Sequence, residues 1–305
     1  MENKRLDYLD NIRWITVVLV IIYHIIYLFN NSGVISNIGV KGIQIMDTFL
    51  IFVYPWFMCL LFIVSGISCN YSLRKRSNKE FIKDRAKRII LPSVLGIFIY
   101  GWISGFITAQ YTDMFAGNGN NIPGFIKYFI YSLMGIGPLW FCHVLFIGSL
   151  LIVLIRKIDK KEKINNLCKK INLPILFILV LLVWGSSFIL NTPLITVYRF
   201  GIYLFMMLLG YYVFSNQELI KKLEKISIQL SLISVVTGIC YVYTYYGQNY
   251  TDNKILNSFF TNLYLWIMIL SIMGIGSKFL NFKNKFTILP PSKGYIGNRL
   301  KNRIL

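Results

Sequence analysis

Five ionisable side chains lie inside long apolar stretches of this 305-residue sequence, and they include both of its histidines. They are Arg13, His24, Asp47, His143 and Arg199. A charged group inside a bilayer is costly, so each needs a structural or a functional reason. An imidazole can accept a proton near neutral pH, a carboxylate can orient it, and a guanidinium group can bind an anion. Together these residue types could carry proton transfer on a bound substrate.

The spacing of Arg13 and His24 suits a shared ligand. Eleven positions along a helix turn by about 1,100°, which is three turns plus about 20°, and rise by about 16 Å. Both side chains are therefore predicted on one face of the first apolar helix. One elongated ligand could contact both.

The other ionisable groups are predicted at the depth of His24. Like His24, Asp47, His143 and Arg199 lie four or five residues inside the end of an apolar stretch that should face outward. At about 1.5 Å per residue, all four fall in one layer about 6–8 Å below the outer boundary. Two histidines, one acid and one arginine at one depth could form a polar site.

Each of these residues also has a purely structural explanation. A histidine in a span more often makes one interhelical hydrogen bond than performs chemistry, which applies to His143. Arg199 could extend to the outer surface, with Asp47 as its counter-ion. Arg13 alone is most simply an anchor at the inner interface. His24 is hardest to explain in this way, because it lies deep in an otherwise apolar run.

The composition indicates what kind of chain must position these groups. Hydrophobic residues make up 56% of it and charged residues 14%, and the mean hydropathy is +0.59. A soluble domain usually has about a quarter charged residues. A cytosolic enzyme, a disordered chain and a secreted disulfide scaffold are therefore excluded, and an all-α, polytopic transmembrane bundle is predicted. The five cysteines are odd in number and show no metal spacing, so no metal site is expected.

Apolar stretches of about 17–25 residues are needed to cross a bilayer, and we identify eight. They are Ile12–Phe29, Ile43–Cys69, Ile89–Ala109, Pro138–Ile155, Pro174–Leu190, Leu194–Phe214, Ile226–Tyr246 and Ile255–Gly276. The second is overlong, which predicts a tilted or partly interfacial helix. A ninth stretch, Ile122–Gly137, is shorter and contains Lys127, so we expect it to be interfacial or re-entrant.

The basic residues are divided unequally between the two sets of connections that eight spans create. One set holds 27 of the 32 Lys and Arg, and the other holds three. Positive residues stay on the cytoplasmic side, so both termini are predicted inside a multi-pass protein of the cell membrane. No basic domain stands apart from the spans, so the net charge of +20 indicates topology and not a nucleic-acid partner.

The order of motifs resembles a known family. Arg13 and His24, separated by ten residues in the first span, are similar to the opening of the acyltransferase-3 family of integral membrane acyltransferases. Three further stretches are similar to that family: Pro55–Gly66, the basic segment Phe81–Pro92, and Gly137–Phe141. The resemblance covers about residues 1–280. It predicts a membrane acyltransferase domain at 1–280 and a polar cytoplasmic tail at 281–305.

The resemblance implies acyl transfer from cytoplasmic acyl-CoA to an acceptor hydroxyl, often that of a cell-surface or exported glycan. The expected donor is acetyl-CoA, a substrate and not a bound cofactor, and the lipid bilayer is the other partner. Arg85 and Arg88 lie three apart on the inner side, where one helical turn would bring both guanidinium groups together. With Arg13 they are predicted to hold the donor phosphates. The alternative is that these arginines only set topology.

Within this reaction, we predict His24 as the general base that takes the proton of the acceptor hydroxyl. An acyl-histidine intermediate is a less favoured variant. Asp47 is predicted to orient or charge-balance His24, and Arg199 and His143 are predicted to bind substrate.

One departure from the family concerns the end of the chain. The family normally continues with one or two more spans, whereas residues 286–305 are polar and contain two adjacent prolines. We therefore expect a truncated or frame-shifted gene product. The alternatives to an active acyltransferase are an inactive remnant and a transporter or flippase whose polar layer binds a solute.

Overall fold

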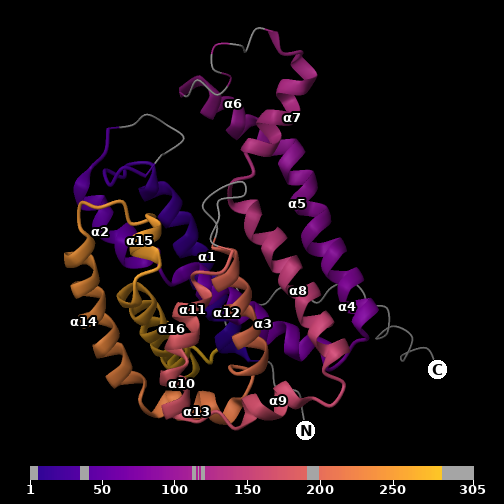
Figure 1. Cartoon of the computed structure of the whole chain (residues 1–305), viewed down its shortest axis with the longest axis vertical. Helices are drawn as coiled ribbons and strands as arrows, with labels where there is room; N and C mark the ends of the chain where they lie inside the picture. Colours follow the sequence, from indigo (N-terminus) through magenta and orange to yellow (C-terminus); the bar gives the residue numbers. More distant parts are fainter. Residues whose placement is uncertain are drawn as a thin grey trace.

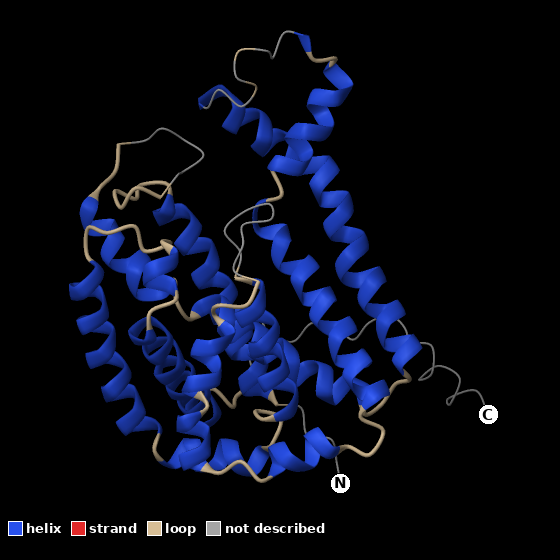
Figure 2. Cartoon of the chain, viewed as in Figure 1, coloured by secondary structure: helices blue, strands red, loops and turns tan. Residues whose placement is uncertain are grey.

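The computed structural model describes residues 6–34, 41–111, 115, 117, 121–190 and 199–283, and every regular element among them is a helix (Figure 2). The α-helices are α1 Asp7–Tyr27, α2 Gln44–Val53, α3 Phe57–Leu73, α4 Asn78–Arg85, α5 Leu91–Gly96, α6 Trp102–Tyr111, α7 Gly124–Met134, α8 Trp140–Ile158, α9 Lys163–Lys169, α10 Leu173–Ile178, α11 Val180–Ser186, α12 Phe200–Tyr212, α13 Gln217–Lys225, α14 Ser227–Tyr245, α15 Asn253–Leu256 and α16 Phe259–Phe279. The fold class is the predicted one, a polytopic helical bundle.

The number of spans is close to the predicted eight. Six helices are long and apolar enough to cross a membrane, and a bent pair, Lys163–Lys169 with Leu173–Ser186, makes a seventh. The pair bends by 111°, so α9 lies across the end of the bundle while α10 and α11 enter it. The remaining predicted span corresponds to α12, a shorter apolar helix of 13 residues, and residues 194–198 at the start of that predicted span lie outside the description. The predicted tail beyond residue 283 lies outside the described residues.

The second predicted span runs through the centre of the bundle. Its 30 residues, Gln44–Leu73, are the most buried of the candidate spans. Pro55 divides it into α2 and α3, because proline has no backbone N–H to continue the helical hydrogen bonds. Its length therefore reflects a central helix that is interrupted at Pro55, and the predicted tilt or partly interfacial position stays a prediction.

Small residues bring α3 and α12 together. A Cβ atom at Gly66 would overlap the Met207 carbonyl of α12, and one at Gly210 would overlap the Ile63 carbonyl of α3. Close packing of this kind is how membrane helices associate where hydrophobic burial gives no driving force. The two glycines therefore allow the backbones of α3 and α12 to lie in direct contact at the centre of the bundle.

The third predicted span is longer than its apolar core. Residues 78–111 form one continuous run in which π-helical segments, η1 Ala86–Ile90 and η2 Ile97–Gly101, separate α4, α5 and α6. The basic segment before the span is thus helical, with Ser77 and Glu80 forming a capping box at its start. The ninth apolar stretch forms α7, which packs along α6 at the end of the molecule opposite α9 and α13 (Figure 1).

The connections rich in Lys and Arg gather at one face, which we call the basic face. Asn11 at the start of α1 donates hydrogen bonds of 2.6 Å and 2.8 Å to the carbonyls of Leu280 and Phe282 after α16. Arg156 at the end of α8 contacts the Leu73 carbonyl at the end of α3. Helices α4, α9 and α13 lie at the same end in Figure 1. By the positive-inside rule, we expect this face to lie on the cytoplasmic side.

Candidate functional site

Arg13 and His24 both belong to α1, which is helical without interruption from Asp7 to Tyr27. The structure thus keeps the predicted spacing of about 16 Å along one face. His24 is exposed at the surface of the protein, among apolar neighbours of the same helix such as Ile21 and Ile25.

The hydrogen bond of His24 fixes its tautomer. Its Nδ1 lies 2.7 Å from the carbonyl oxygen of Val20, one turn earlier in α1. A carbonyl oxygen only accepts hydrogen bonds, so Nδ1 must carry the proton. In the neutral ring, Nε2 then has a free lone pair and can accept a proton from a substrate. The orienting contact that was predicted for Asp47 is therefore made by the backbone at Val20.

Asp47 is fully buried near the far end of the bundle, where it supports the segment that follows α1. Its Oδ1 accepts hydrogen bonds from the backbone N–H of Asn31 at 3.0 Å and from the Ser32 hydroxyl at 3.3 Å. Its other oxygen, Oδ2, has no hydrogen-bond partner among the described residues. The same residues include no hydrogen bond between Asp47 and His24. Any influence of this carboxylate on the imidazole must act through charge or through the 31–32 segment.

A layer of tyrosines holds the end of α1 beside His24. The hydroxyls of Tyr23 and Tyr250 lie 3.1 Å apart, and the ring of Tyr23 packs edge-on against His24 with 5.5 Å between centroids. Burial raises the pKa of Tyr250, so its phenol stays protonated and keeps this contact. This layer was not predicted, because tyrosines in apolar stretches resemble core residues.

Arg13 and Arg85 converge on neighbouring residues of α3. Arg13 donates a 2.7 Å hydrogen bond to the Ser68 hydroxyl and pairs with Asp10 at 3.1 Å. Arg85 lies 3.4 Å from the sulfur of Cys69. The two guanidinium groups, which are far apart in sequence, thus contact adjacent residues of α3.

Arg88 takes a different partner from Arg85. Its Nε lies 2.7 Å from Asp84, one turn back on the same helix, and its side chain is 58% exposed. Asp84 also pairs with Arg76 at 3.0 Å. The predicted helical turn is present, but the two arginines do not share a partner among the described residues.

His143 lies between α5 and α8. Its Nε2 is 3.5 Å from the Ser93 hydroxyl, and its buried Nδ1 has no hydrogen-bond partner in the described part of the chain. A contact with a serine on the neighbouring helix fits the structural explanation considered for this residue. Ser93 was not singled out in the sequence, since a single serine in a span carries little signal.

Arg199 is buried at the start of α12, with 2% of its surface exposed. It donates a 2.9 Å hydrogen bond to the Leu256 carbonyl and lies 3.5 Å from the Asn262 side-chain oxygen. Residues 191–198, which precede it, lie outside the description. Within the described ranges no carboxylate pairs with Arg199, so Asp47 is not its counter-ion there.

The four residues of the predicted polar layer do not contact one another in the described part of the chain. Its four members have separate partners, and no hydrogen bond or ion pair joins any two of them in the residues described. The sequence predicted how deep each residue lies along its span, but not the direction in which its side chain leaves the helix. Only His24 and Arg13 remain related by geometry, because they belong to one helix.

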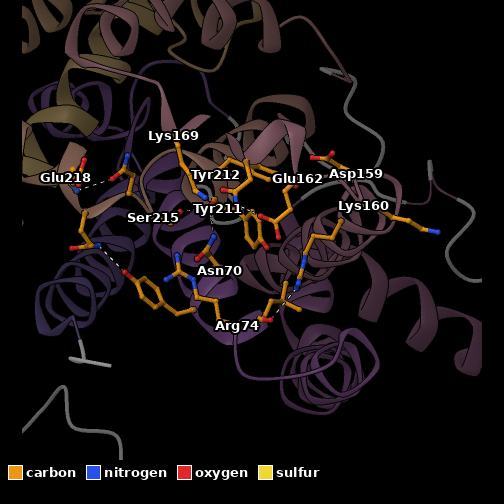
Figure 3. Close-up of a pocket in the computed structure, with 16 residues that line it drawn as sticks. Asn70, Arg74, Asp159, Lys160, Glu162, Lys169, Tyr211, Tyr212, Ser215 and Glu218 are labelled. Atoms are coloured by element: carbon orange, nitrogen blue, oxygen red, sulfur yellow. Dashed lines mark hydrogen bonds between the residues drawn. The ribbon is translucent and has the colours of Figure 1, made fainter. Parts of the chain in front are cut away.

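A cavity of about 910 Å³ opens on the basic face, between the ends of α3, α8 and α12 and the helices α9 and α13 (Figure 3). Its inner wall includes Asn70 and Tyr211, with Arg74, Lys160 and Lys169 around them (Figure 3). Sequence reasoning missed this pocket, because its residues come from three separate segments and its charged residues were explained as topological charges.

Comparison with known proteins agrees with the sequence motifs. A family model described as an acyltransferase domain matches residues 6–292, which is nearly the whole chain. No curated protein and no solved structure matches the chain.

Proposed function

The chain belongs to this membrane acyltransferase family, and we propose that it moves an acetyl group from acetyl-CoA to a hydroxyl of a cell-surface or exported glycan. The observation that carries the proposal is the His24 contact with Val20, which leaves Nε2 as a proton acceptor on the helix face that also bears Arg13. General-base catalysis by histidine typically contributes about 10²–10⁴ in rate.

In the proposed reaction, the acceptor hydroxyl oxygen attacks the thioester carbonyl carbon while Nε2 of His24 takes the hydroxyl proton. Collapse of the tetrahedral intermediate breaks the carbon–sulfur bond. The imidazolium then returns its proton to the departing thiolate. The products are an ester and free CoA, and the ring regains its starting tautomer with the proton on Nδ1.

The donor is proposed to enter from the basic face. Arg13 and Arg85, which converge on α3, would bind its phosphates, and Arg88 would add a solvent-exposed charge at the entrance. The pantetheine arm would follow the α1 face toward His24, over the ~16 Å that separate the two side chains. A basic face in the cytoplasm suits this, because acyl-CoA is made there.

The remaining candidates keep supporting roles in the proposal. Asp47 balances the charge of the imidazolium without touching it, through its place beside the segment that follows α1. His143 and Arg199 are proposed to bind the acceptor, since both have a buried nitrogen without a hydrogen-bond partner in the described residues.

The test is transfer from radiolabelled acetyl-CoA to a cell-surface glycan fraction by the full chain in lipid nanodiscs. We expect label in the glycan and equimolar CoA thiol. His24→Gln should lower kcat by about 10²–10⁴ with little change in the KM for acetyl-CoA. Ile25→Gln, which places the same amide at the neighbouring exposed position, is the matched control. Wild-type turnover by His24→Gln, or solute flux without label transfer, would contradict the proposal.

A further inference from the structure

The segment that leads into the third span carries a row of lysines on one side. Lys79, Lys83 and Lys87 follow one another at four-residue intervals through α4 and η1, so they occupy about the same side of the helical run. We call this row the lysine stripe. All three side chains are exposed, and none of their ammonium groups forms a hydrogen bond or an ion pair with a described residue.

The opposite side of α4 faces the protein. Phe81 is buried, and the central guanidinium carbon of Arg85 lies 5.2 Å from the centre of its ring. Arg85 also contacts Cys69 of α3. Lys83 is two positions from both Phe81 and Arg85, so its side chain leaves α4 about 200° away from theirs. The lysine stripe therefore points away from the bundle and from the Arg13–Arg85 pair that is proposed to bind the donor.

The exposed side of the helical run continues into the membrane as an apolar row. Helices α4 and α5 lie in line along the edge of the molecule (Figure 1). Leu91, Leu95 and Ile99 continue the four-residue spacing, and each is 51–54% exposed. An exposed apolar side chain in a spanning helix contacts the hydrocarbon chains of lipid. Lys87 is thus the last charge of a row that passes directly into a lipid-facing surface.

The carboxylates of the same segment are already engaged. Asp84 pairs with Arg76 at 3.0 Å and with Arg88 at 2.7 Å. Glu80 accepts hydrogen bonds from the backbone N–H of Ser77 at 3.0 Å and from its hydroxyl at 2.9 Å. The lysine stripe therefore keeps three positive charges with which no carboxylate in the described ranges pairs.

We propose that the lysine stripe binds the headgroups of anionic phospholipids in the cytoplasmic leaflet. Charge complementarity favours an anionic partner, and continuity with the lipid-facing row favours a lipid over a soluble ligand. A basic residue near an anionic membrane surface typically strengthens binding by about fivefold. The inference does not depend on the proposed acyl transfer, because the stripe and Arg85 lie on opposite sides of α4.

The three lysines should contribute unequally. The apolar stretch begins at Ile89, so at about 1.5 Å per residue Lys87, Lys83 and Lys79 lie about 3, 9 and 15 Å outside the hydrocarbon. The headgroup layer is about 5–7 Å thick on each side, and salt screens charges over about 8–10 Å. We therefore expect Lys87 within the headgroup layer, Lys83 just beyond it, and Lys79 at the limit of the attraction.

The test is native mass spectrometry of the full chain released from nanodiscs that contain equal amounts of phosphatidylglycerol and phosphatidylcholine. Wild type should retain phosphatidylglycerol over phosphatidylcholine by about fivefold or more. Lys87→Gln should lower this ratio by about fivefold, Lys83→Gln by about two- to threefold, and Lys79→Gln by less than about twofold. Lys87→Arg keeps the charge and should keep the ratio. Lys75→Gln removes an exposed charge farther from the bilayer and is the matched control.

The variants replace exposed side chains, and an unchanged Tm verifies that each one folds. Equal retention of the two lipids by wild type would overturn the inference. Equal losses in Lys87→Gln and Lys75→Gln would also contradict it, because net charge alone would then attract the lipid. A larger loss in Lys79→Gln than in Lys87→Gln, or displacement of the lipid by millimolar inorganic phosphate, would indicate a soluble anion in place of the leaflet.

Discussion

Ser68 and Asn70 are separated by one residue on α3 and serve opposite sides of that helix. Ser68 accepts a 2.7 Å hydrogen bond from Arg13 on α1, whereas Asn70 donates one of 2.9 Å to the Tyr211 carbonyl of α12. The last turns of α3 therefore form the wall between the Arg13–Arg85 pair and the pocket. Small polar residues at this wall position groups on both sides.

Ser68→Ala removes the hydroxyl that holds Arg13. If Arg13 binds the donor phosphates, a guanidinium group that is no longer held by Ser68 should bind them less well. The KM for acetyl-CoA should then rise by about three- to tenfold, and kcat should be nearly unchanged. Steady-state kinetics of label transfer measure this. Ser72→Ala, one turn further along the same helix, is the control. An effect of Ser68→Ala on kcat alone would argue against a role for Arg13 in donor binding.

Asp47→Asn keeps an acceptor for Asn31 and Ser32 but removes the charge. Because the Val20 carbonyl, and not Asp47, contacts His24, we expect kcat to fall by less than about tenfold, far less than for His24→Gln. Asp47→Leu leaves the Asn31 N–H unpaired, and should cost about 1–3 kcal/mol of stability. A loss of activity in Asp47→Asn as large as in His24→Gln would restore the direct orienting role.

Gly66→Ala places a methyl group against the Met207 carbonyl in the tightly packed α3–α12 interface. Neither backbone can move without displacing the central helix pair, so we expect a loss of about 1–3 kcal/mol. Thermal unfolding in detergent measures the change in Tm. Gly185→Ala is the matched control, since its new methyl group would meet no atom within 4 Å. Equal Tm values for the two variants would show that the interface tolerates the methyl group.

The predicted topology is tested by single cysteines in a variant without the five native ones. Cysteines at Lys75 and Lys161 should be protected from an impermeant thiol reagent added to intact cells, and one at Gln248 should react. The physical reason is the retention of the basic face in the cytoplasm. Permeabilised cells, in which all three should react, serve as the control. Labelling of the Lys161 site in intact cells would mean that this topology is wrong.

Patterns confined to one helix were predictable from the sequence. The fold class follows from apolar stretches of sufficient length, and the Arg13–His24 relationship follows from helical spacing. The same reasoning could not tell that residues 44–73 run through the centre of the bundle, because a long, mostly apolar helix is expected whether it faces lipid or protein. The hydrophobicity of a transmembrane helix therefore does not show whether it is surrounded by lipid or by other helices.

Patterns that depend on several helices were less predictable. Equal depth suggested one polar site, but the rotation of each helix directs His143 toward Ser93 and Arg199 toward Leu256. The pocket on the basic face was missed because its cations also satisfy the positive-inside rule, which accounts for them without a ligand.

The contact between His24 and Val20 also limits the paths that a proton can take through the imidazole ring. A histidine with both ring nitrogens open can relay protons from one neighbour to the next, as water-filled proton pathways require. Here Nδ1 is tied to a backbone carbonyl, so protons enter and leave through Nε2 alone. The ring can exchange a proton with a substrate but is a dead end for conduction. If His24 acts as the proposed base, we therefore expect it to return its proton through Nε2 without conducting protons across the membrane.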